Sequence, residues 1–346
     1  LNAVIPMLIV PYYSVIGGWV IKYLAEYLLG NGHALAGDGY FSAFISSGLS
    51  TELCFIVFAA ATLLIIYAGV RNGIERVSKL MMPILVVLSV LIAGYSVTRP
   101  GALAGVKYFL VPNFENFSWM TVVTAMGQMF YSLSIAMGIL ITFGSYMKKS
   151  VSIEGSTETV EIFDTAIAVM AGLMIIPAIF AFSGGDPNML QAGPSLMFIT
   201  IPKVFDSVVW FIPVILAITV AVALLPWILE YFGIFPSRAQ LGVFGILFFM
   251  LVLFAAMTSS IALTESAVST FQDELGWSRH KATLMMGVVM LLLGSLSSLS
   301  YGPLANVTIL GMQLLDFFDF LTNSVMMPAG FTRRRRESRR AGSLPR

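Results

Sequence analysis

Residues 127–138 read GQMFYSLSIAMG and lie inside an apolar run that extends over 118–146. Hydroxyls, an amide and two glycines therefore fall near the middle of a segment long enough to cross a bilayer. Two interpretations are open. Ser132 and Ser134 bond to carbonyls of an uninterrupted helix, or the helix is discontinuous and its freed backbone groups line a site for an anionic substrate group and a small cation.

The composition around this stretch is that of a membrane protein. Hydrophobic residues make up 58% of the 346 and charged residues 11%, too little charge for an ordinary water-soluble surface. A net charge of +1 provides no broad field for nucleic acid, and no nucleic-acid partner is expected. The single cysteine, Cys54, excludes an intrachain disulfide and a multi-cysteine metal site. We expect an all-α membrane protein.

Apolar segments of roughly 20 residues predict the spanning helices. They are 2–29, 51–69, 80–97, 118–146, 162–183, 208–229, 241–265, 281–300 and 310–330. Short basic loops at 71–79, 148–149 and 279–281 are predicted to be cytoplasmic, so an even number of crossings must separate them. Three segments lie between the last two loops. Because 208–229 contains Pro213 and Pro226, we expect that segment to be bent or re-entrant.

Two further groups of polar residues lie in apolar surroundings. Asp164, near the start of 162–183, is a site candidate because an intramembrane carboxylate is costly without a cation; alternatively it lies in a wet interfacial turn near Lys148. The stretch AAMTSSIALTE (255–265) offers hydroxyl and carbonyl oxygens that suit sodium. Its small residues are equally explained by close helix packing.

Enzyme signatures are absent from the sequence. There is no HExxH, GxSxG or P-loop motif, and the two histidines, His33 and His280, lie in predicted loops. The tail RRRRESRRAGSLPR (333–346) is read either as a cytoplasmic patch attracted to anionic lipid or as a remnant of cloning or a frame shift. Because these catalytic motifs are missing, we do not expect an enzyme.

Six segments together resemble the neurotransmitter:sodium symporter family: PYYSVIGGW (11–19), GVRNGIERVSKLMMP (69–83), GQMFYSLSIAMG (127–138), FITIPKVF (198–205), AAMTSSIALTE (255–265) and FQDELGWSR (271–279). The resemblance implies a LeuT-type helical bundle, an incomplete inverted repeat of about eight spanning helices plus one odd apolar insertion. Segment 2–29 resembles the family's third helix and 310–330 the first part of its tenth. We expect the first two helices and the C-terminal helices to be absent and each site to be half complete.

This alignment also predicts the domain organisation. A single transmembrane domain covers 1–331 and includes the insertion near 208–238, which has no functional interpretation. A basic, disordered tail covers 332–346.

The resemblance implies a substrate pocket. Tyr13 resembles the tyrosine that contacts the substrate carboxylate, Ile9 lies one turn away in the pocket wall, and Tyr131 resembles an aromatic lid. The side-chain pocket would be lined by Ser134, Met137, Ser259 and Leu263. Met137 occupies a position where the family often carries phenylalanine, and its flexible thioether leaves room for a bulky apolar or aromatic amino acid.

The same resemblance implies two sodium sites and two gates. One sodium site would use Ser132 and Asp164, and the second the Ala255 carbonyl with the Thr258 and Ser259 hydroxyls. The gate positions would be Gln128 and Asp319 on the extracellular side and Asp273 on the intracellular side.

One departure from the family concerns chloride. Chloride-dependent members carry a serine one turn beyond the ligand matching Asp164, where this chain has Ala168. We expect the Asp164 carboxylate to supply the fixed negative charge and chloride not to be required. The predicted function is sodium-coupled symport of a neutral amino acid by alternating access in a bacterial or archaeal cytoplasmic membrane. The alternative is a non-transporting fragment or membrane interaction partner with incomplete sites.

Overall fold

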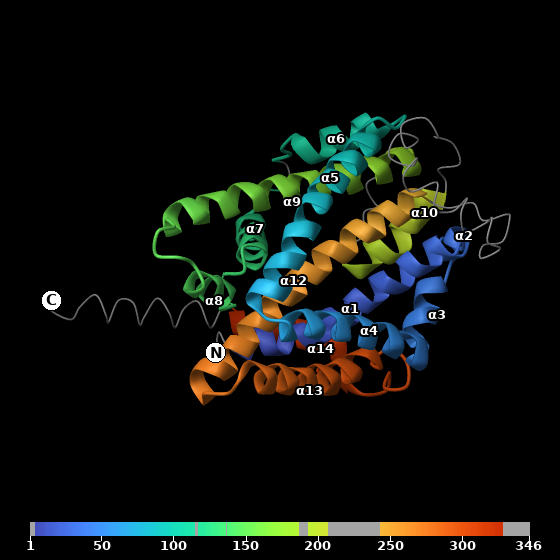
Figure 1. Ribbon diagram of the computed structural model, residues 1–346. Coiled ribbons are helices and arrows are strands. Elements are labelled where there is room, and N and C mark those ends of the chain that lie inside the picture. The colour runs from blue at the N-terminus through green and yellow to red at the C-terminus, as the bar shows by residue number, and fades with distance from the viewer. Residues whose placement is uncertain (1–3, 115–116, 136, 187–192, 207–242, 328–346) are drawn as a thin grey trace, which may run out of the picture.

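The computed structural model describes residues 4–114, 117–135, 137–186, 193–206 and 243–327 (Figure 1). The long helices are α1 (Val4–Leu28), α4 (Gly48–Tyr67), α5 (Glu75–Val97), α7 (Trp119–Ser132), α9 (Ile153–Ser183), α12 (Val243–Leu275) and α13 (Arg279–Ser298). The short helices are α2 (Gly32–Leu35), α3 (Tyr40–Ser46), α6 (Ala102–Leu110), α8 (Ile139–Ser145), α10 (Ile201–Asp206) and α14 (Leu314–Phe320). Single π-helical turns are η1 (Val70–Ile74), η3 (Leu196–Thr200) and η4 (Leu321–Met326).

Within the described residues, six helices are long and apolar enough to cross a membrane: Val4–Leu28, Gly48–Tyr67, Val70–Val97, Ile153–Ser183, Phe244–Leu275 and Arg279–Ser298. About eight were expected. One of the others, 118–146, is divided between α7 and α8. The segment 208–229, the rest of the insertion and the tail lie outside the described residues.

The last predicted helix, 310–330, begins later than expected. Residues Thr308–Ile309 (β1) and Met312–Gln313 (β2) form a short antiparallel hairpin, with Thr308 opposite Gln313. Leu310 and Gly311, both at positive φ, form its turn. Hydropathy alone does not detect such a turn, because the hairpin residues are themselves largely apolar.

Local sequence explains where several helices begin. The Ser118 hydroxyl accepts from the Thr121 amide, and the Thr121 hydroxyl accepts from the Ser118 amide, which makes a capping box at the start of α7. Ser152 caps α9 and Ser278 caps α13 through the same kind of side-chain acceptor.

Helix α1 lies at the centre of the bundle and packs against α4, α12 and α13 (Figure 1). Glycine permits this close approach: a Cβ on Gly18 would lie 2.6 Å from the Phe55 backbone nitrogen on α4. The fully buried Phe55 ring lies against Gly294 of α13 in the same way. The core therefore consists of tightly packed helices around α1.

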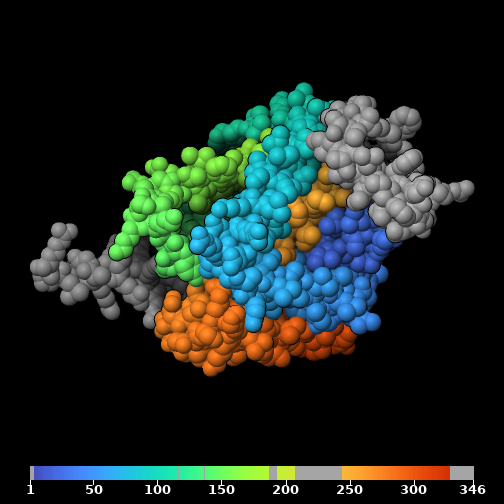
Figure 2. Space-filling view, viewed as in Figure 1, coloured from blue at the N-terminus to red at the C-terminus, as the bar shows by residue number. Residues whose placement is uncertain are grey.

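A second group of helices lies on one side of this core. Helix α9 packs along α5 and α6, and Figure 2 shows the green residues of α7–α9 as a lobe beside the cyan α5. Helix α9 has many exposed apolar side chains, including Ile162 and Phe163, and α7 has no buried residue among those described. Apolar exposure on this scale fits helices in a bilayer.

Candidate functional site

The predicted discontinuous helix is present. Helix α7 ends at Ser132, and α8 begins only at Ile139. Ser134 has φ 55° and Gly138 has φ 79°, left-handed values that an α-helix does not contain. Of the two interpretations of 127–138, the structure supports the interrupted helix. Such a break leaves backbone groups available for a ligand.

The second half of the broken helix is fixed to α12. The Ser266 hydroxyl donates to the Met137 carbonyl at 3.3 Å, inside the break. The Thr142 and Ser269 hydroxyls form a buried hydrogen bond of 3.1 Å between α8 and α12. Met137 is also buried. These contacts hold α8 in place, so the two halves of the broken helix are supported very differently.

The first half ends beside Asp164. The Ser132 hydroxyl lies 2.7 Å from one Asp164 carboxylate oxygen and 3.0 Å from the other. Ser132 is the last residue of α7, and Asp164 is a half-buried residue in the fourth turn of α9. The structure therefore brings together the two side chains of the first predicted sodium site. It also places Asp164 on a regular helix rather than in a turn.

The predicted substrate tyrosine also meets its expected neighbours. The Tyr13 side chain of α1 interacts with Ser259 of α12, and its hydroxyl lies close enough to that of Tyr131 for the two to interact electrostatically. Tyr13 and Tyr131 both pack against the main hydrophobic core, while Ile9 is fully buried and Leu263 is 5% exposed. Side chains from α7 and α12 thus meet Tyr13 of α1.

The second predicted sodium site lies on α12. The Thr258 hydroxyl donates to the Phe254 and Ala255 carbonyls of its own helix, each at 3.0 Å. Ser259 is exposed and its side chain interacts with Tyr13 of α1. The neighbouring Ser260 is buried and bonds to Thr62 of α4 at 3.2 Å. The hydroxyl cluster therefore serves packing on one face and presents oxygen atoms on another.

Of the two predicted extracellular gate residues, Asp319 lies close enough to Tyr131 to interact with it electrostatically. Gln128 is exposed on α7, and the Asp319 carboxylate accepts a 2.6 Å hydrogen bond from Asn323. Sequence reasoning missed Tyr12, whose buried hydroxyl bonds to Thr322 at 3.1 Å and also interacts with Asp319. The motif PYYSVIGGW contains both tyrosines, but it does not reveal that they face different helices.

The structure pairs Arg279 at the start of α13 with Glu265 of α12, and it places the predicted intracellular gate residue Asp273 outside this pair. The guanidinium donates to both carboxylate oxygens, at 3.0 and 2.6 Å, and to the Ile66 carbonyl at 2.9 Å. The Tyr146 hydroxyl donates to the same carboxylate at 2.7 Å. Glu265 is completely buried and Asp273 is exposed. The sequence contained a signal that Glu265 needs a positive partner, because Glu265, like Asp164, is a carboxylate in an apolar helix.

The donor set indicates which ion the site could hold. Among the described residues there is no group of three or more His, Cys, Asp or Glu side chains able to hold a metal. The available ligands are instead hydroxyl, carbonyl and single carboxylate oxygens. Such oxygens suit a hard alkali cation better than a transition metal.

Comparisons with known proteins agree with this geometry. Residues 43–330 match the model of the sodium:neurotransmitter symporter family. The chain is 34% identical to the uncharacterized sodium-dependent transporter YhdH of Bacillus subtilis, over 93% of this chain and 65% of that protein. It is 30% identical to an uncharacterized sodium-dependent transporter of Haemophilus influenzae, over 92% of this chain and 64% of that protein. The chain therefore spans slightly less than two thirds of the length of these relatives.

A solved structure is also similar to this chain. MhsT in complex with L-phenylalanine superposes with a TM-score of 0.75 at 35% identity, covering 95% of this chain and 68% of that one. An identity at this level over nearly the whole chain supports a shared LeuT-type fold.

Proposed function

Because this chain belongs to the sodium:neurotransmitter symporter family, we propose that it binds sodium and a neutral amino acid as part of a secondary transporter. It is an integral membrane protein with several spanning helices, and its relatives are named as sodium-dependent transporters. In the proposed cycle, the sodium gradient drives uptake by alternating access, with no covalent chemistry.

One observation carries this proposal: the helix break between α7 and α8 has a carboxylate beside it. Ser132 ends α7 with its hydroxyl on Asp164, and Ser134 and Gly138 adopt left-handed φ values before α8 begins at Ile139. A carboxylate inside a membrane requires a positive partner. Among the described residues, Asp164 forms no ion pair, so a bound sodium ion is the partner that we propose.

The proposed substrate is a bulky apolar or aromatic amino acid. Tyr13 and the freed backbone of the break would bind its carboxylate and amine, and Tyr131 would cover it. Ile9, Ser134, Met137, Ser259 and Leu263 would surround its side chain. The similarity to MhsT, which was solved with L-phenylalanine, supports this size class.

We also propose that chloride is not required. Asp164 already supplies a fixed negative charge next to the proposed ion, and Ala168 has no hydroxyl to bind an anion. Replacing sodium chloride with sodium gluconate should leave amino-acid binding unchanged. A large loss of binding in gluconate would contradict the proposal.

A second candidate is a non-transporting fragment or membrane interaction partner. It is favoured by one observation: α7 buries none of its described side chains, although it carries Gln128 and Tyr131 of the proposed site. This candidate predicts that no amino acid binds in a sodium-dependent manner.

Equilibrium binding of labelled L-phenylalanine and L-leucine to the purified chain distinguishes the two candidates. Binding that requires sodium, and that potassium does not support, is the result expected for the symporter site. Asp164→Asn should abolish this dependence, whereas Glu161→Gln, an exposed acid one turn earlier on α9, should preserve it. Binding equal in sodium and potassium would reject the proposed function.

A further inference from the structure

A separate pocket lies between the ends of α5, α9 and α12, away from the break. Its volume is about 410 Å³, and it is lined by Tyr95, Ser96, Arg99, Pro100, Ala178, Ala181, Phe182, Val204, Phe205 and Phe244. Cavities of this size hold small molecules or parts of larger ones. None of these residues belongs to the proposed amino-acid site.

Eight of the ten residues that line the pocket are apolar or aromatic, and the other two are Ser96 and Arg99. The Tyr95 and Phe244 rings lie with their centroids 4.1 Å apart, and Phe205 meets Phe244 edge-on at 5.1 Å. The Ser96 hydroxyl is already used, because it donates to the Met174 carbonyl at 2.7 Å. The wall therefore suits an apolar body.

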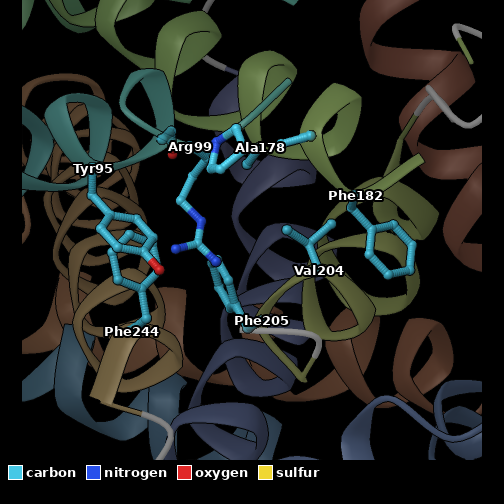
Figure 3. Close-up of a pocket in the computed structure, with 10 residues that line it drawn as sticks. Tyr95, Arg99, Ala178, Phe182, Val204, Phe205 and Phe244 are labelled. Carbon is cyan, nitrogen blue, oxygen red and sulfur yellow. The ribbon is translucent and has the colours of Figure 1, made fainter. Parts of the chain in front are cut away.

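One cation extends into this apolar space. Figure 3 shows the Arg99 side chain entering the cavity, with its guanidinium between the Tyr95 and Phe244 rings on one side and Phe205 on the other. Its Cζ atom lies 5.0 Å from the Tyr95 ring centroid. Within the described part of the chain, no carboxylate forms an ion pair with Arg99. Its fork of donors is thus suited to bind an anion.

The depth of the pocket points to the membrane interface. Helix α5 has 23 residues, and its first residues, from Glu75, belong to the basic segment 71–79 that the positive-inside rule places in the cytoplasm. At 1.5 Å per residue it rises about 34 Å, slightly more than the roughly 30 Å hydrocarbon core. Arg99, two residues past its end, lies at the level of lipid head groups on the opposite side.

We propose that this pocket binds an anionic lipid, with the phosphate or carboxylate of the lipid on Arg99 and the upper part of its acyl chain among the aromatic rings. The positive charge of Arg99 favours an anionic head group, and the apolar part of the wall favours an acyl chain. The proposal does not depend on sodium or amino-acid binding, because it uses none of the residues assigned to those ligands.

Native mass spectrometry of the purified chain in neutral detergent tests this site. Dioleoylphosphatidylglycerol should remain bound at about tenfold lower concentration than dioleoylphosphatidylcholine, as expected for a charge-assisted bond. Arg99→Gln should remove this preference. Arg71→Gln, which removes an exposed cation at the other end of the same span, should keep it. Equal binding of the two lipids, or equal loss in both variants, would overturn the proposal.

A second variant covers the case in which Arg99→Gln does not fold. Ala181→Trp keeps Arg99 and fills the cavity from α9, so it should also abolish the preference for phosphatidylglycerol; unchanged binding would overturn the site. Competition with oleate identifies the source of the anion. If a lower concentration of oleate than of phosphatidylglycerol displaces the bound lipid, the site is assigned to a fatty acid. If phosphatidylglycerol displaces it at the lower concentration, the site is assigned to a phospholipid.

Discussion

Two carboxylates lie on spanning helices close to the two halves of the broken helix, and their charges are balanced in different ways. Glu265 is completely buried and receives hydrogen bonds from Arg279 and Tyr146. Asp164 is half-buried and receives a hydrogen bond from the Ser132 hydroxyl. The first carboxylate is neutralised by the protein itself. The second has a hydrogen-bond donor but no protein cation among the described residues.

This difference separates a structural role from a binding role. A buried acid that already has a bidentate guanidinium has no capacity for another cation, so Glu265 fixes α12 to the start of α13. An acid with only a hydroxyl partner remains available to an ion that comes and goes. The comparison predicts that changes at Glu265 affect stability first, and changes at Asp164 affect sodium binding first.

The largest expected effect is on stability at Glu265. Glu265→Ala leaves the Arg279 guanidinium without its buried partner, which should lower the free energy of unfolding by about 3–5 kcal/mol. Thermal unfolding of the purified chain, in the absence of sodium, measures this loss. Asp273→Ala is the matched control, because Asp273 is an exposed acid on the same helix and its removal should cost about 0.5 kcal/mol or less.

A double variant shows whether the loss comes from an unpaired charge. Replacing both partners with apolar residues, as in Glu265→Leu with Arg279→Met, should restore much of the stability that the single change removes. If the double variant is less stable than Glu265→Ala, the two residues act independently and the interpretation as a neutralised pair is wrong.

The next largest effect concerns Asp164 and sodium. Opposite charges about 4 Å apart attract by about 4 kcal/mol at an effective dielectric of 20, so Asp164→Asn should weaken sodium binding by at least about a hundredfold. The sodium concentration that supports half-maximal phenylalanine binding measures it. Sodium-free stability should hardly change. A variant that unfolds while its sodium affinity is preserved would reverse the assigned roles of the two acids.

The helix break and the partner of Asp164 could be anticipated from the sequence, whereas the partner of Glu265 could not. Serines and glycines in the middle of an apolar run made an interruption one of two interpretations, and the structure ends α7 at Ser132 and begins α8 at Ile139. The Ser132–Asp164 contact followed from the family resemblance. No partner was predicted for Glu265, and the structure pairs it with Arg279. The neighbours of Arg279 in sequence are Asp273 and Glu274, but α12 turns its Glu265 side toward Arg279, which lies 14 residues further along the chain. Such pairings depend on which face each helix turns toward its neighbour. The spacing of residues that are close in sequence does not show this orientation.

Similar limits explain the other differences. The hairpin at Thr308–Gln313 depends on positive φ at Leu310, and leucine gives no sign of that conformation. The buried bond between Tyr12 and Thr322 joins residues 310 positions apart in the chain. The family resemblance and the LeuT-type fold were confirmed. They could be predicted from long apolar periodicity and six ordered motifs, because neither requires such long-range contacts to be known.

A smaller effect is expected from the hydroxyl that contacts Asp164. Ser132→Ala removes the donor but leaves the carboxylate, so sodium affinity should fall by about three- to tenfold, the effect of losing one modest hydrogen bond. Sodium titration of phenylalanine binding measures this, with Thr142→Val as the control. Thr142 bonds to Ser269 in the fixed half of the broken helix, and its loss should lower stability without changing sodium affinity. Equal changes in sodium affinity for both variants would show that the two halves are not functionally distinct.

The smallest effect tests the same principle at an exposed ion pair. Lys203 of α10 donates to Asp38 at 2.6 Å and lowers the pKa of that carboxyl, which is 94% exposed. A lowered pKa in the folded state means that the pair stabilises the protein above the unfolded pKa near 4, and that this contribution is lost as the pH falls further. The melting temperatures of wild type and Asp38→Asn should therefore differ slightly at pH 7 in low salt and converge below pH 4. High salt should also remove the difference, because water and ions screen exposed charges. A difference that survives high salt would mean that this loop contact resembles the buried Glu265 pair, and that burial alone does not separate the two kinds of carboxylate.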